Sequence, residues 1–244
     1  MNIVRAFLST AVLFSVWFSF LLSFLFLPLP GSAAARTPFQ VRCEDDLGKT
    51  VSLLTARQSG YSLNHERSYK TLTQMKPPGR ANAMVLGLTK TESRIEVKLA
   101  GAILQDAASG YECVAPQITV RLFYDPVVIY VGREFPAGSC SYAQILAHEL
   151  RHMKVYLDHL PVVETAVRAA LAHRFEAKPL YAPSGTARSA LEHEVNSGWL
   201  PYIKAEMAKV ELQQEAIDSV QEYARLGASC NGEITRILGP LARG

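Results

Sequence analysis

The sequence predicts an α+β fold in which a β-rich N-terminal half, with a mostly antiparallel sheet, packs on a helical C-terminal half. Between residues 36 and 138, apolar residues alternate with polar ones or form short β-branched runs, which is typical of strands. Between residues 139 and 244, apolar residues recur every three or four positions, which is typical of helices. We expect residues 36–244 to form a single domain, since a chain of this length can build one good core.

The first 35 residues are predicted to be a signal peptide rather than part of the fold. Arg5 is followed by an almost unbroken apolar run, Ala6 to Leu27, and small residues stand at Ala33 and Ala35. Cleavage after Ala35 would export the chain to the periplasm or the extracellular space, without stable membrane insertion. The run is also long enough to span a bilayer, so an uncleaved anchor is the alternative.

All four cysteines follow the predicted leader: Cys43, Cys113, Cys140 and Cys230. An even number of cysteines in an exported chain predicts two disulfide bonds. Because no Cys-x-x-Cys is present, a zinc–thiolate site is not expected. Three pairings are possible. We favour Cys43–Cys113, which would tie the β-rich part together, and Cys140–Cys230, which would tie the main helix to the C-terminal region.

The β-rich part contains several segments with strand patterns. Residues 83–89 and 93–99 flank Lys90-Thr91-Glu92, an arrangement that predicts a hairpin. Residues 117–123 alternate between polar and apolar, and residues 127–131 form an apolar run, as in a buried strand.

The helical part begins with an apolar-periodic run from Ser141 to Leu160. One face carries an apolar stripe: Leu146, Leu150, Met153, Leu157 and Leu160. His148 and His152 lie on the other side, so we expect the helix to pack on one face and to present the histidines on the other. Residues 162–175 are expected to form a second helix, or to continue the first helix after a kink at Pro161. Residues 186–226 are expected to be helical, with a kink or break near Gly198 and Pro201.

The run contains a His-Glu-x-x-His motif, His148 to His152. Two histidines four positions apart on a helix lie about one turn from each other on one face, so both imidazoles can reach the same metal ion. Glu149 would then lie beside the metal, where its carboxylate can accept a proton from an activated water. This is the arrangement of zinc metalloproteases, in which the glutamate is the general base and not a ligand. The motif therefore predicts Zn²⁺ as cofactor.

Catalytic zinc usually has three protein ligands, and the motif supplies only two. Our first choice for the third is Glu194, because it shares a predicted helical face with apolar residues. A glutamate on such a face is costly to bury unless it is paired or bound to a metal.

Four other residues are weaker candidates for the third ligand. Glu192 and His193 neighbour the first choice. Asp158 occupies the last ligand position of a longer motif, His-Glu-x-x-His-x-x-Gly-x-x-His, but Val155 replaces the glycine that turns the chain. His159 lies on the histidine face. If the helix continues, both Asp158 and His159 are carried about 9 Å or more along the axis, too far for one metal.

On His148, Glu149 and His152 the chain resembles the zincin metallopeptidases, and within them the glutamate-ligand, gluzincin-like branch. It also resembles a group of bacterial secreted proteins described as zinc-dependent proteases. The resemblance implies two histidine ligands, Glu149 as general base, and a peptide or protein as substrate. Tyr156, one turn after His152, is the candidate donor to the oxyanion, and residues 127–131 are the candidate strand for binding the substrate backbone.

The composition excludes one other class of partner. The formal net charge is +3 at pH 7 and no basic run is present, so nucleic acid is not an expected partner. The expected function is thus a secreted or periplasmic zinc-dependent peptidase. The alternative is a catalytically silent zincin fold that serves as a binding or scaffold protein of the cell envelope.

Overall fold

Strands come first along the chain and helices follow, as the sequence predicts, in an α+β arrangement. The computed structural model describes residues 35–47, 51–57, 60–76, 84–175 and 178–241. The predicted signal peptide, apart from Ala35, lies outside these ranges, and the residues from Arg36 onward form one compact unit. Within the described ranges, no helix is both long enough and apolar enough to cross a membrane.

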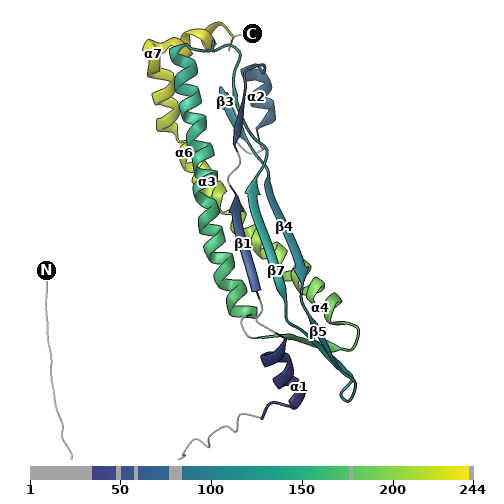
Figure 1. Ribbon diagram of the computed structural model, residues 1–244. Helices are drawn as coiled ribbons and strands as arrows, with labels where there is room; N and C mark the ends of the chain where they lie inside the picture. Colours follow the sequence, from purple (N-terminus) through teal and green to yellow (C-terminus); the bar gives the residue numbers. More distant parts are fainter. Residues whose placement is uncertain (1–34, 48–50, 58–59, 77–83, 176–177, 242–244) are drawn as a thin grey trace, which may run out of the picture. The chain divides into compact units, whose positions relative to one another are not determined.

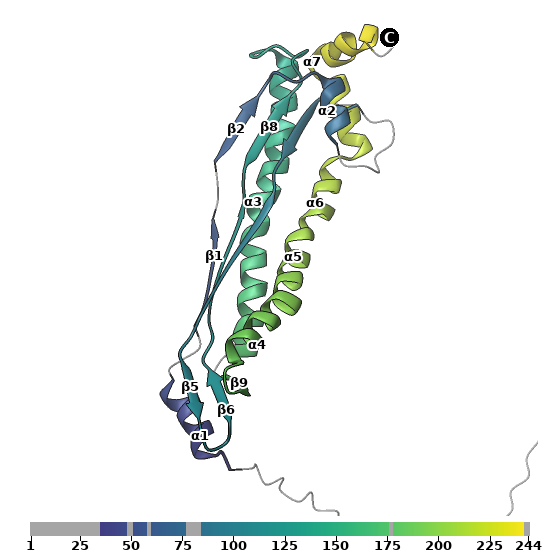
Figure 2. The same cartoon turned by 90° about the vertical axis from the view of Figure 1, so that its right-hand side faces the viewer.

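Three chain segments pair side by side along two successive three-stranded sheets (Figures 1 and 2). The first sheet has the order β1-β7-β4 and the second has the order β2-β8-β3. The bounds are β1 Val51–Arg57, β2 Tyr61–Asn64, β3 Gly87–Lys90, β4 Ser93–Ala100, β7 Gln117–Tyr124 and β8 Val127–Val131. In both sheets the central strand pairs parallel with one neighbour and antiparallel with the other.

The predicted hairpin between residues 83–89 and 93–99 is wrong. The strands β3 and β4 do form there, but β3 pairs with β8 and β4 pairs with β7. The chain continues in the same direction through Lys90-Thr91-Glu92, opposite the break between β7 and β8, where the backbone N–H of Asp125 donates to the Glu92 carbonyl at 3.0 Å. Alternation of residues indicates an extended strand, but it does not identify the strand beside it.

A third sheet has the order β5-β6-β9 and is entirely antiparallel, with bounds β5 Ile103–Asp106, β6 Tyr111–Val114 and β9 Leu180–Pro183. The short N-terminal helix α1 (Pro38–Val41) and the π-helical turn η1 (Arg42–Asp46) attach to it. The attachment is covalent, since Cys43 is bonded to Cys113 of β6. The second disulfide joins Cys140 to Cys230, so both favoured pairings are confirmed.

The helical half is built on one long helix, α3 (Cys140–Phe175), which passes through Pro161 without ending. It contacts strands of both long sheets on one side and α5, α6 and α7 on another (Figures 1 and 2). The remaining helices are α2 Tyr69–Met75, α4 Ala187–Glu194, η2 Val195–Trp199, α5 Leu200–Ala208, α6 Val210–Ile217 and α7 Val220–Leu241. The break expected near Gly198 is the π-helical turn η2.

The main core lies between β7 and the helices. Every second residue of β7 is buried, and these side chains meet one apolar stripe of α3. The facing residues are Ile118, Val120, Leu122 and Tyr124 from β7, and Leu160, Val163, Val167, Leu171 and Phe175 from α3. In the N-terminal half of α3, Glu149 contacts β3 on one side, and His148 and His152 contact α6 and α7 on another.

Candidate metal centre

The two motif histidines lie in the buried N-terminal half of α3. His148 is 5% exposed and His152 is 9% exposed, so this face of the helix is not open to solvent. Their Nε2 atoms lie 3.1 Å apart, as the one-turn spacing predicts. The expectation that the helix packs on its apolar stripe and presents the histidines on the other side is wrong. The histidine side is buried because α6 and α7 cover it, whereas four of the five residues of the expected stripe are only half-buried.

Asp218 completes a group of three possible ligands. It is the residue that ends α6, and its Oδ1 lies 3.2 Å from Nε2 of His148 and 3.2 Å from Nε2 of His152. The three atoms form a nearly equilateral triangle. Ligands that hold zinc tetrahedrally at about 2.0–2.1 Å lie about 3.3 Å from one another. The triangle therefore fits one face of a tetrahedral metal site.

The second nitrogen of each histidine contacts an oxygen that can only accept a hydrogen bond. Nδ1 of His148 donates to Oε1 of Glu222 at 3.1 Å, and Nδ1 of His152 donates to Oε1 of Gln214 at 2.6 Å. The amide of Gln214 is oriented by its own Nε2, which donates to the carbonyl of His152 at 3.1 Å. In the neutral form, these contacts place the proton of each imidazole on Nδ1 and the lone pair of Nε2 on the side of Asp218. This is the tautomer that a metal ligand requires.

Two arginines hold the Glu222 carboxylate in place. Arg225 donates to its two oxygens at 2.9 and 2.7 Å, and Arg151 donates to Oε1. The hydrogen bonds from Arg225 lower the pKa of Glu222 to about 2, assisted by those from His148 and Arg151. Arg151 also lies 2.9 Å from Nδ1 of His148, but a guanidinium only donates, so Glu222 is the acceptor that both groups share. The carboxylate stays ionised and orients His148.

Glu149 lies on the strand side of α3, facing β3. Oγ1 of Thr89 lies 2.9 Å from its Oε2 and 2.9 Å from its backbone carbonyl. Gly87 leaves room for this side chain, because a Cβ at that position would lie 2.7 Å from Oε1. Burial raises the pKa of Glu149. The negative charge of Asp218 adds to this rise, whereas the hydrogen bond from Thr89 opposes it. Glu149 is thus a buried carboxyl beside the group of three ligands but not a member of it.

Glu194, our first choice for the third ligand, does not lie in this group. Its carboxylate accepts from Arg174 at 2.8 Å and from Nε1 of Trp199 at 3.3 Å. Arg174 is on the same helix as His152 but about six turns further along, or roughly 33 Å away. A carboxylate paired with Arg174 cannot reach an ion held by His148 and His152. The half-buried position of Glu194 is satisfied by an ion pair, not by a metal.

The weaker candidates also lie elsewhere. Glu192 and His193 are exposed, and Asp158 pairs with Lys154 at 2.5 Å on the surface of α3. His159 is buried, with its Nε2 2.9 Å from the carbonyl of Glu206. Within the part of the chain that the structure describes, only Asp218 joins the two histidines.

The sequence contains a signal for Asp218 that our reasoning missed. Gln214, Asp218 and Glu222 recur every four positions, so they share one side of the α6–α7 segment, and all three contact a motif histidine. Polar residues at helical spacing normally indicate a solvated face. Here the same spacing marks a face turned towards α3.

Tyr156 and strand β8 are not placed as expected. The ring of Tyr156 packs 4.9 Å from that of Tyr124 beside the main core. The tyrosine ring that lies beside His148 belongs instead to Tyr223, with centroids 6.4 Å apart. Both edges of β8 are already paired, with β2 and β3, so β8 cannot accept a substrate strand. Among the described strands, β3 pairs only with β8, so its other edge pairs with no strand, although α2 also contacts β3.

No protein-family model, curated protein or solved structure matches the chain. The functional interpretation therefore depends on the residues of this chain and on their geometry.

Proposed function

We propose that the protein is an exported zinc-dependent peptidase of the zincin type, with His148, His152 and Asp218 as metal ligands and Glu149 as general base. The observation that carries the proposal is the triangle of two Nε2 atoms and one Oδ1 with sides of 3.1, 3.2 and 3.2 Å. Two buried histidines and an aspartate are costly to gather without a charge that they share. A divalent cation supplies that charge.

The donor set supports zinc as the ion. Two imidazoles and one carboxylate are typical ligands of catalytic zinc, which keeps its fourth position open. Glu222 and Gln214 act on the other nitrogens as the orienting partners that such sites have. The two disulfides are compatible with an oxidising, exported compartment.

Zinc bound there would activate a water molecule and polarise the carbonyl of a peptide bond. Glu149 is a buried carboxyl that is not among the three ligands and, unlike Glu222, is not paired with arginines, and it would accept the proton of the attacking water. Its raised pKa suits this role, since the protonated carboxyl must then deliver the proton to the leaving amine. Thr89 and Gly87 hold the carboxyl in position from β3.

The free edge of β3 is the best-placed surface for the substrate backbone. An extended peptide added to this edge would form main-chain hydrogen bonds with residues 87–90 and would run beside Glu149. Strand addition recognises the backbone of a peptide, while side-chain subsites set its sequence preference. A peptide or an unfolded segment of a protein is therefore the substrate class that we propose.

The first test is the zinc content of the purified exported protein after dialysis against trace zinc, with Asp218→Ala compared to Glu194→Ala. We expect stoichiometric zinc in the parent protein and in Glu194→Ala. Asp218→Ala should lower the affinity by more than about 100-fold, because loss of an orienting partner alone costs 10- to 100-fold. Equal zinc affinity in the two variants would contradict the ligand assignment.

The second test separates an enzyme from a scaffold. Glu149→Gln should retain zinc and lose hydrolysis of a fluorogenic peptide library, because the amide cannot accept the proton. Hydrolysis at the parent rate by Glu149→Gln would contradict its role as base. A protein that binds zinc and cleaves none of the peptides, with or without Glu149, would instead be a silent zincin-like scaffold.

A further inference from the structure

The two disulfides differ in their exposure to solvent. Cys43 is 1% exposed and Cys113 is 0% exposed, so their bond is sealed inside the fold. Cys140 is exposed and Cys230 is half-buried. A disulfide is reduced when a thiolate reaches one of its sulfur atoms, so access decides which bond reacts first. A dithiol in solution would therefore reach the Cys140–Cys230 bond before the other.

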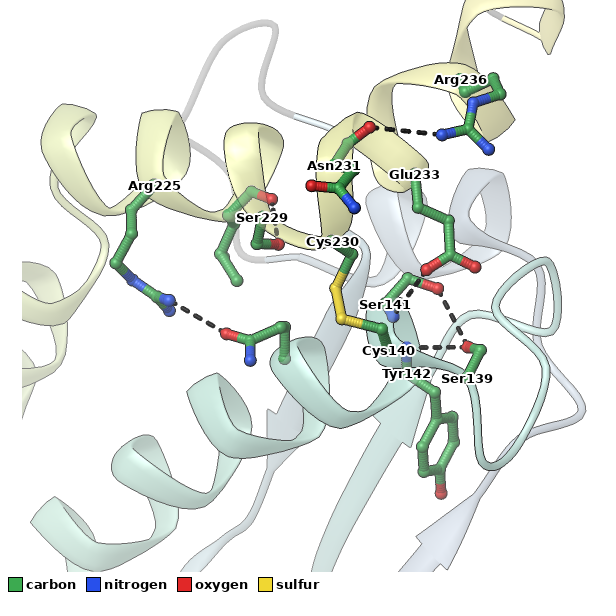
Figure 3. The surroundings of a disulfide bond; sticks show 12 residues. Ser139, Cys140, Ser141, Tyr142, Arg225, Ser229, Cys230, Asn231, Glu233 and Arg236 are labelled. Carbon is green, nitrogen blue, oxygen red and sulfur yellow. Dashed lines mark hydrogen bonds between the residues drawn. A yellow bond between two sulfur atoms is a disulfide. The ribbon is translucent and has the colours of Figure 1, made fainter.

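The accessible disulfide joins the two helices that build the metal centre. Cys140 is the first residue of α3, about two turns before His148. Cys230 lies in α7, about two turns after Glu222, and Asp218 lies just before the start of α7. Figure 3 shows the bond bridging the start of α3 and α7. It is thus the covalent link between the helix with both histidines and the segment with Asp218 and Glu222.

Polar contacts beside the disulfide also depend on the position of α7 relative to α3. Oε2 of Glu233 accepts from the backbone N–H of Ser141 at 3.0 Å, and this carboxylate thereby caps the N-terminus of α3 from α7 (Figure 3). Arg225, which holds Glu222, also reaches Gln144 of α3 at 3.0 Å. The donors and acceptors of both contacts come from α3 and α7, so a shift between these helices would break them.

The backbone at the disulfide is strained. Cys230 has φ 55° and Asn231 has φ 54°, followed by Gly232 at φ 73°. The left-handed region favours glycine, and a residue with a Cβ is disfavoured there. Cys230 and Asn231, which both have a Cβ, interrupt α7 in this conformation, and the disulfide bond ties Cys230 to Cys140. Opening the bond would free this turn to relax and the two parts of α7 to move.

We propose that the Cys140–Cys230 disulfide is a redox-cleavable clasp on the metal centre, opened by a dithiol reductant, and that opening it weakens zinc binding. A thiolate of the reductant attacks Sγ of Cys140, the S–S bond breaks, and Cys230 leaves as a thiolate that takes up a proton. The second thiol of the reductant then displaces Cys140. The protein gains two electrons and two protons, and the reductant becomes a disulfide.

The proposal of a clasp depends on the proposed zinc centre, because zinc affinity is the property that opening the disulfide would change. Zinc affinity is measured by competition with a chelator on the exported protein, with both disulfides intact. A second sample is reduced with dithiothreitol, alkylated with iodoacetamide so that the thiols cannot bind zinc, and freed of reagents. Mass spectrometry verifies that Cys43–Cys113 is intact. We expect the zinc Kd to rise about tenfold or more on opening the clasp, comparable to loss of an orienting partner.

A variant pair provides the matched control. Cys140→Ser with Cys230→Ser should show the same rise in zinc Kd without any reductant. Cys43→Ser with Cys113→Ser should leave the Kd unchanged, because that bond ties η1 to β6, and neither of these elements carries a residue of the metal centre. Equal rises in both double variants would overturn the proposal, since they would report a general loss of stability.

Thermodynamic linkage between zinc binding and reduction of the Cys140–Cys230 disulfide gives a test that needs no variant. If opening the clasp weakens zinc binding tenfold, saturating zinc must shift the equilibrium of Cys140–Cys230 with dithiothreitol by the same factor, about 30 mV for two electrons. An unshifted equilibrium together with an unchanged Kd would overturn the clasp. Failure of the fully oxidised protein to bind zinc would contradict the proposed function instead.

Discussion

Gly87→Ala tests whether β3 positions Glu149, the proposed general base. The Cβ of an alanine would lie 2.7 Å from Oε1 of Glu149, 2.8 Å from Cγ of Glu149 and 2.7 Å from Cγ2 of Ile145. Real Cβ atoms essentially never approach other heavy atoms below 3.0 Å. Either β3 or the Glu149 side chain must therefore move. Overpacking of this kind costs about 1–3 kcal/mol of folding free energy.

The functional effect should exceed the effect on stability. A displacement of about 1 Å in a catalytic group can lower the rate by about 100-fold. The ligands His148, His152 and Asp218 do not contact Gly87 at this range, so zinc content should stay at the parent level. The predicted signature is a kcat/KM about 100-fold lower, a KM changed little, and full zinc occupancy.

The assay combines peptide hydrolysis, zinc analysis and urea unfolding. Gly198→Ala is the control, because a Cβ there meets nothing within 4 Å. That substitution should leave activity unchanged and alter stability by less than about 1 kcal/mol. Parent activity in Gly87→Ala would refute the role of β3 in placing Glu149. A loss of zinc together with activity would show that the substitution disturbs the whole centre.

Three further predictions concern other carboxyl groups and the Thr89 hydroxyl. Glu222→Gln should weaken zinc binding by about 10- to 100-fold, whereas Glu215→Gln on the exposed side of α6 should not, in a chelator competition. Thr89→Val should lower kcat/KM by about 10-fold or more at full zinc occupancy, because a hydrogen bond to a charged group contributes roughly 1.5–3 kcal/mol, and parent kinetics would contradict this. Glu112 is buried and accepts from the backbone N–H groups of Ala187 and Gly185, which lower its pKa. Its stabilising effect should thus be complete above its unfolded pKa and disappear as the pH falls through the lower folded value. Urea unfolding should show Glu112→Gln less stable than the parent at pH 7 and closer to it at pH 3, while the exposed Glu96→Gln should differ little at either pH.

Features that depend on nearby residues were predictable. The helical spacing of His148 and His152 places their Nε2 atoms 3.1 Å apart, because four residues make about one turn whatever surrounds the helix. The adjacent Glu149 is turned to a different side for the same reason. The disulfide pairing was also predicted, although the bonded cysteines are 70 and 90 residues apart, because each half of the chain was expected to be tied by its own pair.

Features that depend on the packing of distant segments were not predictable from the sequence. Alternation identified β3 and β4 as strands but led to a false hairpin, because pairing with β7 and β8 is decided by which backbone edges meet. The partner of a buried polar residue was predicted wrongly for the same reason. Glu194 was correctly expected to lie partly buried among apolar residues, but an arginine neutralises it and not a metal.

The sequence by itself determined two histidines and an adjacent glutamate on one helix, in an α+β chain with two disulfides. The tertiary structure decided that Asp218 joins those histidines from 66 and 70 residues away, that β3 and not β8 lies beside the base, and that an exposed disulfide links the two helices of the centre. Backbone geometry repeats every few residues and can be read locally. The side of a later helix that faces α3 depends on the breaks at η2 and at Asp218 and on how each segment packs, so only the folded chain shows it.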